Sequence, residues 1–342
     1  MLRLEGPLGD LVAALDGVER LVLLGDTLEL RAGPVHGVLE RARPALRRLA
    51  EGLDGRDVVI VPGNHDHALA AGWLERRAQP LGLEERCPPA AASTIAAALA
   101  EALAPSPVEL RYPGLWLADG VYALHGHYLD VHMTVPTLER LAVAASGRLT
   151  LEGSRRWDDA RSADDYEAVV APLYAWVHAA AQTGRPSEAV AGGGTVRGWN
   201  ALRGNGRGTF VRARALEGAF RVAVRSLNAA GLGPLRSELS MAELRRSGLR
   251  AASEVLARLG VRARHVIFGH THRAGMLADD VGPEWLTPDG ARLHNTGSWT
   301  FSRTFSQGPE SPYWPGGAVV VEEGSEPRLL RLLARREAEE LV

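Results

Sequence analysis

The chain has 342 residues, of which 46% are hydrophobic and 23% charged, and a formal net charge of −2. This composition is typical of a folded, soluble protein, and the near-balanced charge argues against a partner recognised through a global basic field, such as nucleic acid. All 39 basic residues are arginine, which excludes a P-loop lysine and Schiff-base chemistry.

The sequence contains a single cysteine, Cys87. It cannot form an internal disulfide bond or a thiolate metal cage, so the composition fits a reducing compartment and we expect a cytoplasmic protein. The N-terminal residues do not follow a signal-peptide pattern, because Glu5, Gly6 and Asp10 interrupt the apolar positions. The most apolar long stretch, 88–104, is too short to span a bilayer, so we expect no transmembrane segment.

The first 130 residues alternate between helical and strand patterns. Apolar spacing predicts helices over 8–15, from Pro34 onward with a kink or break at Pro44, and over about 91–104. Short apolar runs that end in turn residues predict strands, and runs apolar on both faces are typical of strands buried on both sides. The strands predicted in this way are 21–24, 58–61, 115–117 and 121–124, the last two forming a hairpin.

Residues 133–262 are mostly helical in pattern, which predicts a helical insertion large enough to form a small domain. An apolar stripe over 166–180 and a capping box at Ser240–Glu243 predict two of its helices, and the glycine- and arginine-rich stretch 192–208 predicts a mobile loop. We expect its tryptophans to pack in the core or cap helices; they are Trp157, Trp176 and Trp199.

Strand patterns return after the insertion, at 265–268, 291–299 and 318–321. The charged end of the chain, 326–342, predicts a polar, solvated tail. The expected organisation is therefore a β-rich core in two parts, 1–132 and 263–325, interrupted by the insertion.

Polar residues follow four of the predicted strands at the point where each strand ends. They are Gly25-Asp26, Gly63-Asn64-His65-Asp66, His125-Gly126-His127 and Gly269-His270-Thr271-His272. Ligands of open sheets gather beyond strand ends, where glycines let the backbone approach closely. Carboxylate, amide and imidazole ligands without thiolates indicate a divalent transition metal.

These residues resemble the calcineurin-like metallophosphoesterase superfamily, in which GD, GNH(D/E), H and GHxH motifs follow strands in this order. The turn Asn295-Thr296-Gly297-Ser298 is similar to the turn that follows GHxH in that family. The resemblance covers about 1–130 and 263–325. It implies an α+β fold, a four-layer αββα sandwich of two mixed β-sheets with a helical insertion.

The resemblance also implies a site for two divalent metal ions, with Mn²⁺ favoured and Fe or Zn as alternatives. Asp26 would bridge the metals, His65 would be the general acid, and Asp66 would orient His65. The remaining implied ligands are Asn64, His125 and His270 at one metal and His272 at the other. His127 and Asp130 are candidates for supporting contacts behind these ligands.

The family's first motif, Asp-x-His at the end of the first strand, is absent from its place. The only Asp-x-His outside the Asn-His-Asp-His turn is Asp130-Val131-His132, downstream of the third motif. We therefore expect a first strand to be missing, with Met1 not the natural start, and this form to bind one metal well and turn over poorly.

The function that follows is hydrolysis of phosphomonoester, phosphodiester or pyrophosphate bonds by a hydroxide bridging two metals, with the helical insertion as a cap that selects a small-molecule or lipid-like substrate. Peripheral membrane contact and oligomeric state stay open. The alternative is a catalytically impaired or non-catalytic family member that uses the fold as a binding scaffold, which the absent Asp-x-His would explain.

Overall fold

The computed structural model describes residues 2–151, 156–184, 210–238 and 240–342, which divide into two compact units. Unit 1 comprises Met1–His127 and Leu259–Val342, and unit 2 comprises Tyr128–Arg258. The predicted insertion, 133–262, falls within a few residues of unit 2. The expected mobile loop 192–208 and Trp199 lie outside the described residues. None of the described helices has the length and apolarity needed to cross a membrane.

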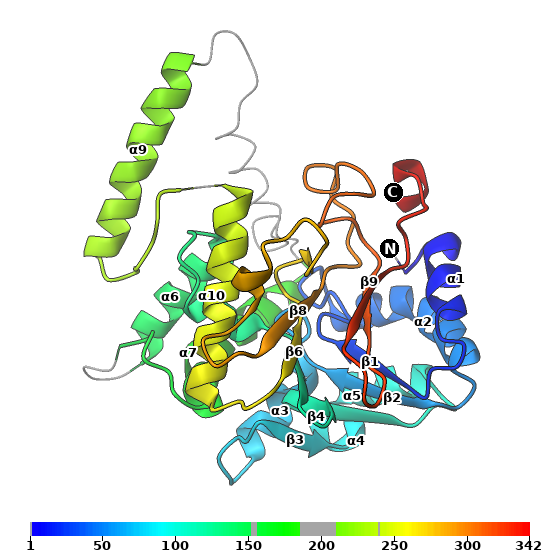
Figure 1. The fold of residues 1–342 in the computed structure, drawn as a ribbon. Coiled ribbons are helices and arrows are strands. Elements are labelled where there is room, and N and C mark those ends of the chain that lie inside the picture. Colours follow the sequence, from blue (N-terminus) through cyan, green and yellow to red (C-terminus); the bar gives the residue numbers. More distant parts are fainter. Residues whose placement is uncertain (1, 152–155, 185–209, 239) are drawn as a thin grey trace. The chain divides into compact units, whose positions relative to one another are not determined.

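Unit 1 contains a curled, mixed eight-stranded sheet that includes each predicted strand except 318–321, which is found as β9 in a separate two-stranded sheet (Figure 1). Its strands, in the order in which they pair, are β1 (Arg20–Leu24), β2 (Asp57–Val61), β4 (Val108–Ala118), β5 (Val121–Leu124), β6 (His265–Phe268), β8 (Arg292–Thr296) and β7 (Ala274–Gly275), with β3 (Glu84–Cys87) paired to β4. The coarse expectation of a mixed α+β fold is thereby confirmed.

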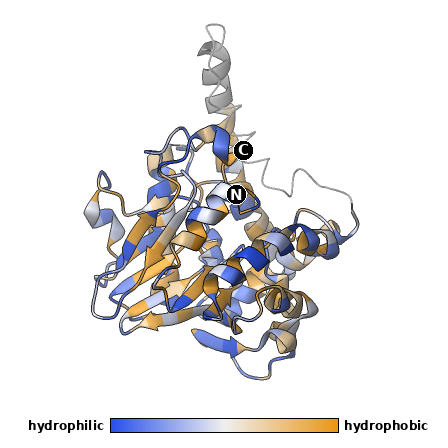
Figure 2. Ribbon diagram, turned by 90° about the vertical axis from the view of Figure 1, so that its right-hand side faces the viewer, coloured by the Kyte–Doolittle hydropathy of each residue, from blue (hydrophilic) through white to orange (hydrophobic). Residues whose placement is uncertain are grey.

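The long strand β4 joins the two halves of this sheet. Its first residues pair in parallel with β2, and its last residues pair antiparallel with β5 through the expected hairpin. In β2, Val58 and Ile60 pack with the helices, whereas Val59 and Val61 pack with β4, β5 and β6. Most strand residues are accordingly hydrophobic (Figure 2), because the inner strands are buried on both faces, whereas β3 is polar.

Helices cover the β1–β2 half of the sheet. They are α1 (Glu5–Ala13), α2 (Val35–Leu53), α3 (Ala68–Arg76), α4 (Pro89–Ala92) and α5 (Thr94–Ala102). Pro44 lies inside α2 without dividing it. The alanine-rich helix expected over 91–104 is instead two helices, because Ser93 takes an extended conformation and its hydroxyl accepts the N–H of Ala96 as the N-cap of α5.

The C-terminal residues are not the solvated tail that their charge suggested. Strand β10 (Arg328–Arg331) pairs with β9 (Gly317–Val320), and Leu333 and Leu341 are buried with Trp314. The guanidinium of Arg336 contacts Asp10 on α1 at 2.8 and 3.0 Å. The prediction of a solvated tail was wrong because it was based on the charged residues alone, whereas the apolar residues between them are buried. The short 3₁₀ turn η3 (Ala338–Leu341) ends this part of the chain, and another, η2 (Gly282–Trp285), lies earlier, between β7 and β8.

The described part of unit 2 is helical, as predicted. After the 3₁₀ turn η1 (His127–Val131) come α6 (Leu138–Thr150), α7 (Ala163–Gln182), α9 (Phe210–Ala229) and α10 (Met241–Leu259). The capping serine Ser240 accepts the N–H of Glu243 at 3.0 Å, as expected, and Gly260 closes α10 with a positive φ of 70°. Trp157 is buried, but Trp176 is 64% exposed, so its expected packing was wrong.

Candidate metal centre

The polar residues after the strand ends of unit 1 converge on the amide oxygen of Asn64. This oxygen lies 3.1 Å from Nε2 of His125 and 3.2 Å from Nδ1 of His270. Nε2 of His125 is also 3.3 Å from a carboxylate oxygen of Asp26. Four of the five predicted metal ligands, far apart in the sequence, are thus brought together.

The backbone of this cluster is held in unusual conformations. Asp26, His270 and His272 have φ angles of 53°, 63° and 60°, in the left-handed region that non-glycine residues rarely occupy. The glycines beside them leave no room for a side chain: a Cβ on Gly25 would lie 1.9 Å from Nδ1 of His125, and one on Gly63 would lie 2.3 Å from the Asp26 carboxylate. Strained residues of this kind cluster at functional sites.

The hydrogen bonds of His125 leave its inner nitrogen facing two acceptors. Nδ1 lies 2.9 Å from the carbonyl oxygen of Leu24 and therefore donates its proton there. Nε2 then presents a lone pair toward oxygens of Asn64 and Asp26. Three facing lone pairs repel one another unless Nε2 carries a proton or a metal ion lies between them.

The pKa values of Asp26 and His125 are shifted by their closeness to each other. Burial tends to raise the pKa of Asp26, but His125 and His65 outweigh it and hold that pKa well below its usual range. Burial tends to lower the pKa of His125, but the Asp26 carboxylate reverses this effect and raises it to about 8. The site therefore contains a stable carboxylate next to an imidazole that attracts positive charge.

Asp66 has a different role from the one expected. Its carboxylate accepts three backbone N–H groups, from Gly63 at 2.7 Å and from Asp26 and Leu28 at 3.2 Å. Burial, and then the charge of Asp26, raise the pKa of Asp66 to about 6. Asp66 therefore ties the loops after β1 and β2 together, whereas we had expected it to orient the ring of His65.

The ring of His65 is held instead by two residues that the sequence reasoning missed. Its Nδ1 lies 2.5 Å from a carboxylate oxygen of Glu29, and the guanidinium of Arg31 contacts the ring at Nε2. With Nδ1 donating to Glu29, Nε2 points toward Arg31 and lies 3.7 Å from Asp26. The sequence signal that could have identified them is that Glu29 and Arg31 follow Gly25-Asp26 within five residues, in Gly-Asp-Thr-Leu-Glu-Leu-Arg.

His272, His127 and Asp130 take three different positions. His272 is exposed to solvent, although protein atoms packed near its ring lower its pKa to about 4, against the opposing charge of Asp26. His127 is buried behind the cluster, with its ring 5.7 Å from that of His125 and its Nε2 3.1 Å from the Tyr112 hydroxyl. Asp130 is buried and belongs to unit 2, whereas the residues of the cluster belong to unit 1.

Asn295 fixes the loop that carries His270 and His272. Its side-chain amide donates to the carbonyl oxygen of Gly269 at 3.3 Å and to the Thr271 hydroxyl at 2.8 Å, and its oxygen accepts the N–H of Gly297 at 2.9 Å. The turn at Asn295–Ser298, noted in the sequence, thus supports the histidine loop directly.

The donor set suits a divalent metal, although the cluster is looser than a closed cage. Ligands at about 2.1 Å from one metal lie about 3.0–3.4 Å from each other, which matches the separations around Asn64. Among the described residues, no three His, Cys, Asp or Glu side chains are grouped closely enough to hold a metal by themselves. The amide oxygen of Asn64 is the donor that links the imidazoles and the carboxylate.

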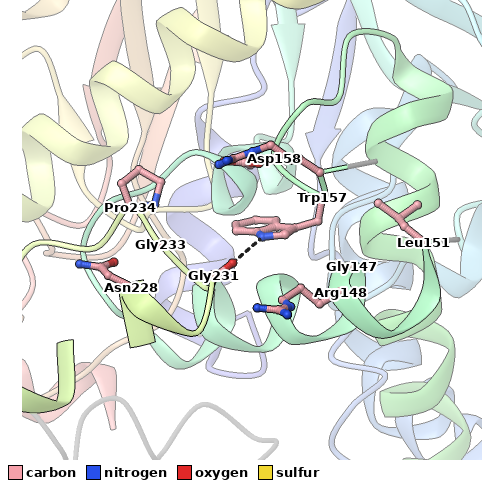
Figure 3. A pocket seen from close by; sticks show the side chains of 10 residues that line it. Gly147, Arg148, Leu151, Trp157, Asp158, Asn228, Gly231, Gly233 and Pro234 are labelled. Carbon is pink, nitrogen blue, oxygen red and sulfur yellow. Dashed lines mark hydrogen bonds and ion pairs between the residues drawn. The ribbon is translucent and has the colours of Figure 1, made fainter. Parts of the chain in front are cut away.

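Unit 2 has a pocket of about 690 Å³, which differs chemically from this cluster (Figure 3). The Trp157 indole N–H donates to the carbonyl oxygen of Gly231 at 3.2 Å, and the Asn228 side chain is bonded to the backbone of Leu235. Arg156 is paired with Asp158. The polar groups named here are therefore hydrogen-bonded or ion-paired within unit 2. They do not place acceptor atoms opposite one another, as the cluster of unit 1 does.

Comparisons with known proteins gave no match: no protein-family model, no curated protein and no solved structure is similar enough to this chain to be recognised. The resemblance to metallophosphoesterases therefore depends on the motif residues and on their convergence at Asn64.

Proposed function

We propose that the chain is a metal-dependent phosphoesterase. The observation that supports this proposal is the set of facing lone pairs on Asp26, Asn64 and His125, where an imidazole that already donates its other proton meets two oxygen acceptors. A buried arrangement of this kind is stabilised by a cation, and hard-to-borderline donors favour Mn²⁺, Fe or Zn.

Bound divalent metal ions would activate water and neutralise the phosphoryl oxygens during hydrolysis. The residues that would hold them are Asp26, Asn64, His125 and His270, with His272 as the donor to a second ion. His65 would move a proton at Nε2, because Glu29 accepts the Nδ1 proton and holds the ring with Nε2 toward Asp26. Arg31 would bind phosphoryl oxygens once it leaves the ring of His65.

The finer description of the fold belongs to the same proposal. We interpret the curled sheet as the two facing halves of an αββα sandwich, since residues of β2 on one half share a buried cluster with β5 and β6 on the other. Selection of a small-molecule or lipid-like phosphoester by unit 2 is likewise proposed, by analogy with helical insertions in similar enzymes.

The decisive experiment compares His125→Gln with His294→Gln, two substitutions of buried histidines in unit 1. We expect the native chain to bind Mn²⁺ in calorimetry and to release 4-nitrophenol from mono- or bis-(4-nitrophenyl) phosphate after Mn²⁺ is added. His125→Gln should weaken Mn²⁺ binding at least about 10-fold, and His294→Gln should leave it unchanged. Equal Mn²⁺ affinity in the two variants would refute the proposed centre.

A binding scaffold is the second candidate, and it has a specific observation in its favour. No group of three imidazole and carboxylate side chains is close enough to hold a metal within the described ranges. A scaffold requires no turnover, so it predicts that both phosphate esters stay intact after Mn²⁺ is added, whether or not the chain binds the metal. Turnover that disappears in His125→Gln would exclude the scaffold.

A further inference from the structure

Helix α9, drawn in light green in Figure 1, concentrates positive charge in unit 2. It contains four arginines and one glutamate, in a chain whose net charge is −2. In the sequence, Glu217 is the only acidic residue between Glu188 and Glu238. The positive charge of α9 is therefore not offset by acidic neighbours along the chain.

The second half of α9 exposes a basic stripe with an apolar residue beside it. Arg221 and Arg225 lie one turn apart and are both exposed, and Val222 next to them is 59% exposed. Val224 is only 4% exposed, and Phe220 and Leu227 on the same side are half-buried. The helix is therefore amphipathic, with its basic stripe toward solvent.

These arginines differ from those of the neighbouring helix α10. Arg246 and Arg250 both contact Glu243, and Arg258 contacts Glu254 at 2.6 Å. Within the described part of the chain, Arg221 and Arg225 form no ion pair. Their guanidinium groups are thus available to an anionic partner.

We propose that α9 binds the surface of an anionic lipid bilayer. Arginines on an amphipathic helix are attracted by anionic headgroups, and an apolar side chain between them can enter the boundary of the acyl region. A single-stranded nucleic acid fits less well, because Phe220, the aromatic residue of the stripe-bearing segment 218–229, faces the half-buried side and offers no base an exposed ring. This surface is independent of the phosphoesterase proposal.

The test is sedimentation of the full chain with vesicles at 50 mM salt. One set of vesicles is pure phosphatidylcholine and the other contains phosphatidylglycerol. The test variant is Arg221→Gln/Arg225→Gln. The matched control is Arg43→Gln/Arg47→Gln on α2, where two exposed arginines have the same spacing and the same loss of charge. Circular dichroism checks that both variants keep the native helix content.

We expect the native chain to bind the anionic vesicles and not the neutral ones. The α9 variant should partition about 30-fold more weakly, the effect of two arginines near an anionic surface, and the α2 control should bind like the native chain. Absence of binding to the anionic vesicles, or an equal loss in both variants, would overturn the proposal. Displacement of the vesicles by an equimolar single-stranded oligonucleotide would overturn it in favour of nucleic acid.

Discussion

The candidate centre of unit 1 and the polar interior of unit 2 hold buried polar side chains in opposite ways. In unit 1, Asp26, His270 and His272 are in loops with positive φ. In unit 2, His132 and Tyr166 pair at 2.8 Å, and Tyr128 donates to Glu167 at 2.7 Å; these residues lie on α7, on η1 and in the turn directly after η1. All non-glycine residues with positive φ in the described chain belong to unit 1.

The two regions also differ in how their hydrogen-bonding atoms are paired. In unit 2, both of these contacts join a donor to an acceptor, since the Tyr166 hydroxyl meets a ring nitrogen and the Tyr128 hydroxyl meets a carboxylate. In unit 1, Nε2 of His125 meets two acceptors. Strained backbone that brings acceptors together indicates a binding function, whereas regular backbone that pairs donors with acceptors indicates a structural one.

A matched pair of glycine substitutions should show this difference most strongly. In Gly25→Ala the new Cβ would overlap the ring of His125 at a φ of 87°, so we expect a loss of about 3 kcal/mol or more in the free energy of unfolding. In Gly218→Ala on α9 the Cβ meets nothing within 4 Å, so we expect a gain of about 0.5–1 kcal/mol. Urea unfolding of both variants measures these changes.

The Gly25→Ala variant should also lose Mn²⁺ binding, because its Cβ would displace the His125 ring. Similar stabilities for the two alanine variants would show that the loop after β1 is free to rearrange, and the contrast between the two units would then fail.

Asp66 should come next in effect, because it anchors the two loops of the centre. In Asp66→Asn an NH2 group replaces one of the two carboxylate oxygens, so either the N–H of Gly63 or the N–H of Leu28 faces a donor and loses its acceptor. We expect a loss of about 2–3 kcal/mol in the free energy of unfolding. The control is Asp54→Asn, at the exposed left-handed end of α2, which should change stability by less than about 0.5 kcal/mol. Equal losses in both would assign no anchoring role to Asp66.

The strands were predictable from the sequence because burial on both faces leaves a simple pattern. The runs at 21–24 and 58–61 correspond to β1 and β2 within one residue at each end. The approach of Asn64 to His125 was also within reach, since both follow the ends of strands and side chains at strand ends converge.

Other features depend on tertiary structure that a local pattern does not contain. Glu29 and Arg31 reach His65 only because the chain after Asp26 turns back toward the loop after β2. The C-terminal residues are buried because β10 pairs with β9. Trp176 shows the reverse error, because the apolar stripe of α7 is wider than the face that the helix buries.

The smallest effect that we expect concerns pH and unit 2. Burial, and then the charge of Arg258, lower the pKa of His132 to about 4. Between that value and the pKa of about 6.5 of an unfolded histidine, the unfolded chain binds more protons. Stability should therefore fall as the pH drops through this window, by up to about 1 kcal/mol per pH unit from this residue.

His132→Gln cannot be protonated and can still bond to Tyr166, so its stability should depend less on pH. Urea unfolding at pH 7, 6 and 5 measures the difference between the two proteins, in which the other buried histidines cancel. Parallel curves would mean that His132 is protonated at no cost, and that the polar interior of unit 2 admits charge as readily as the centre of unit 1.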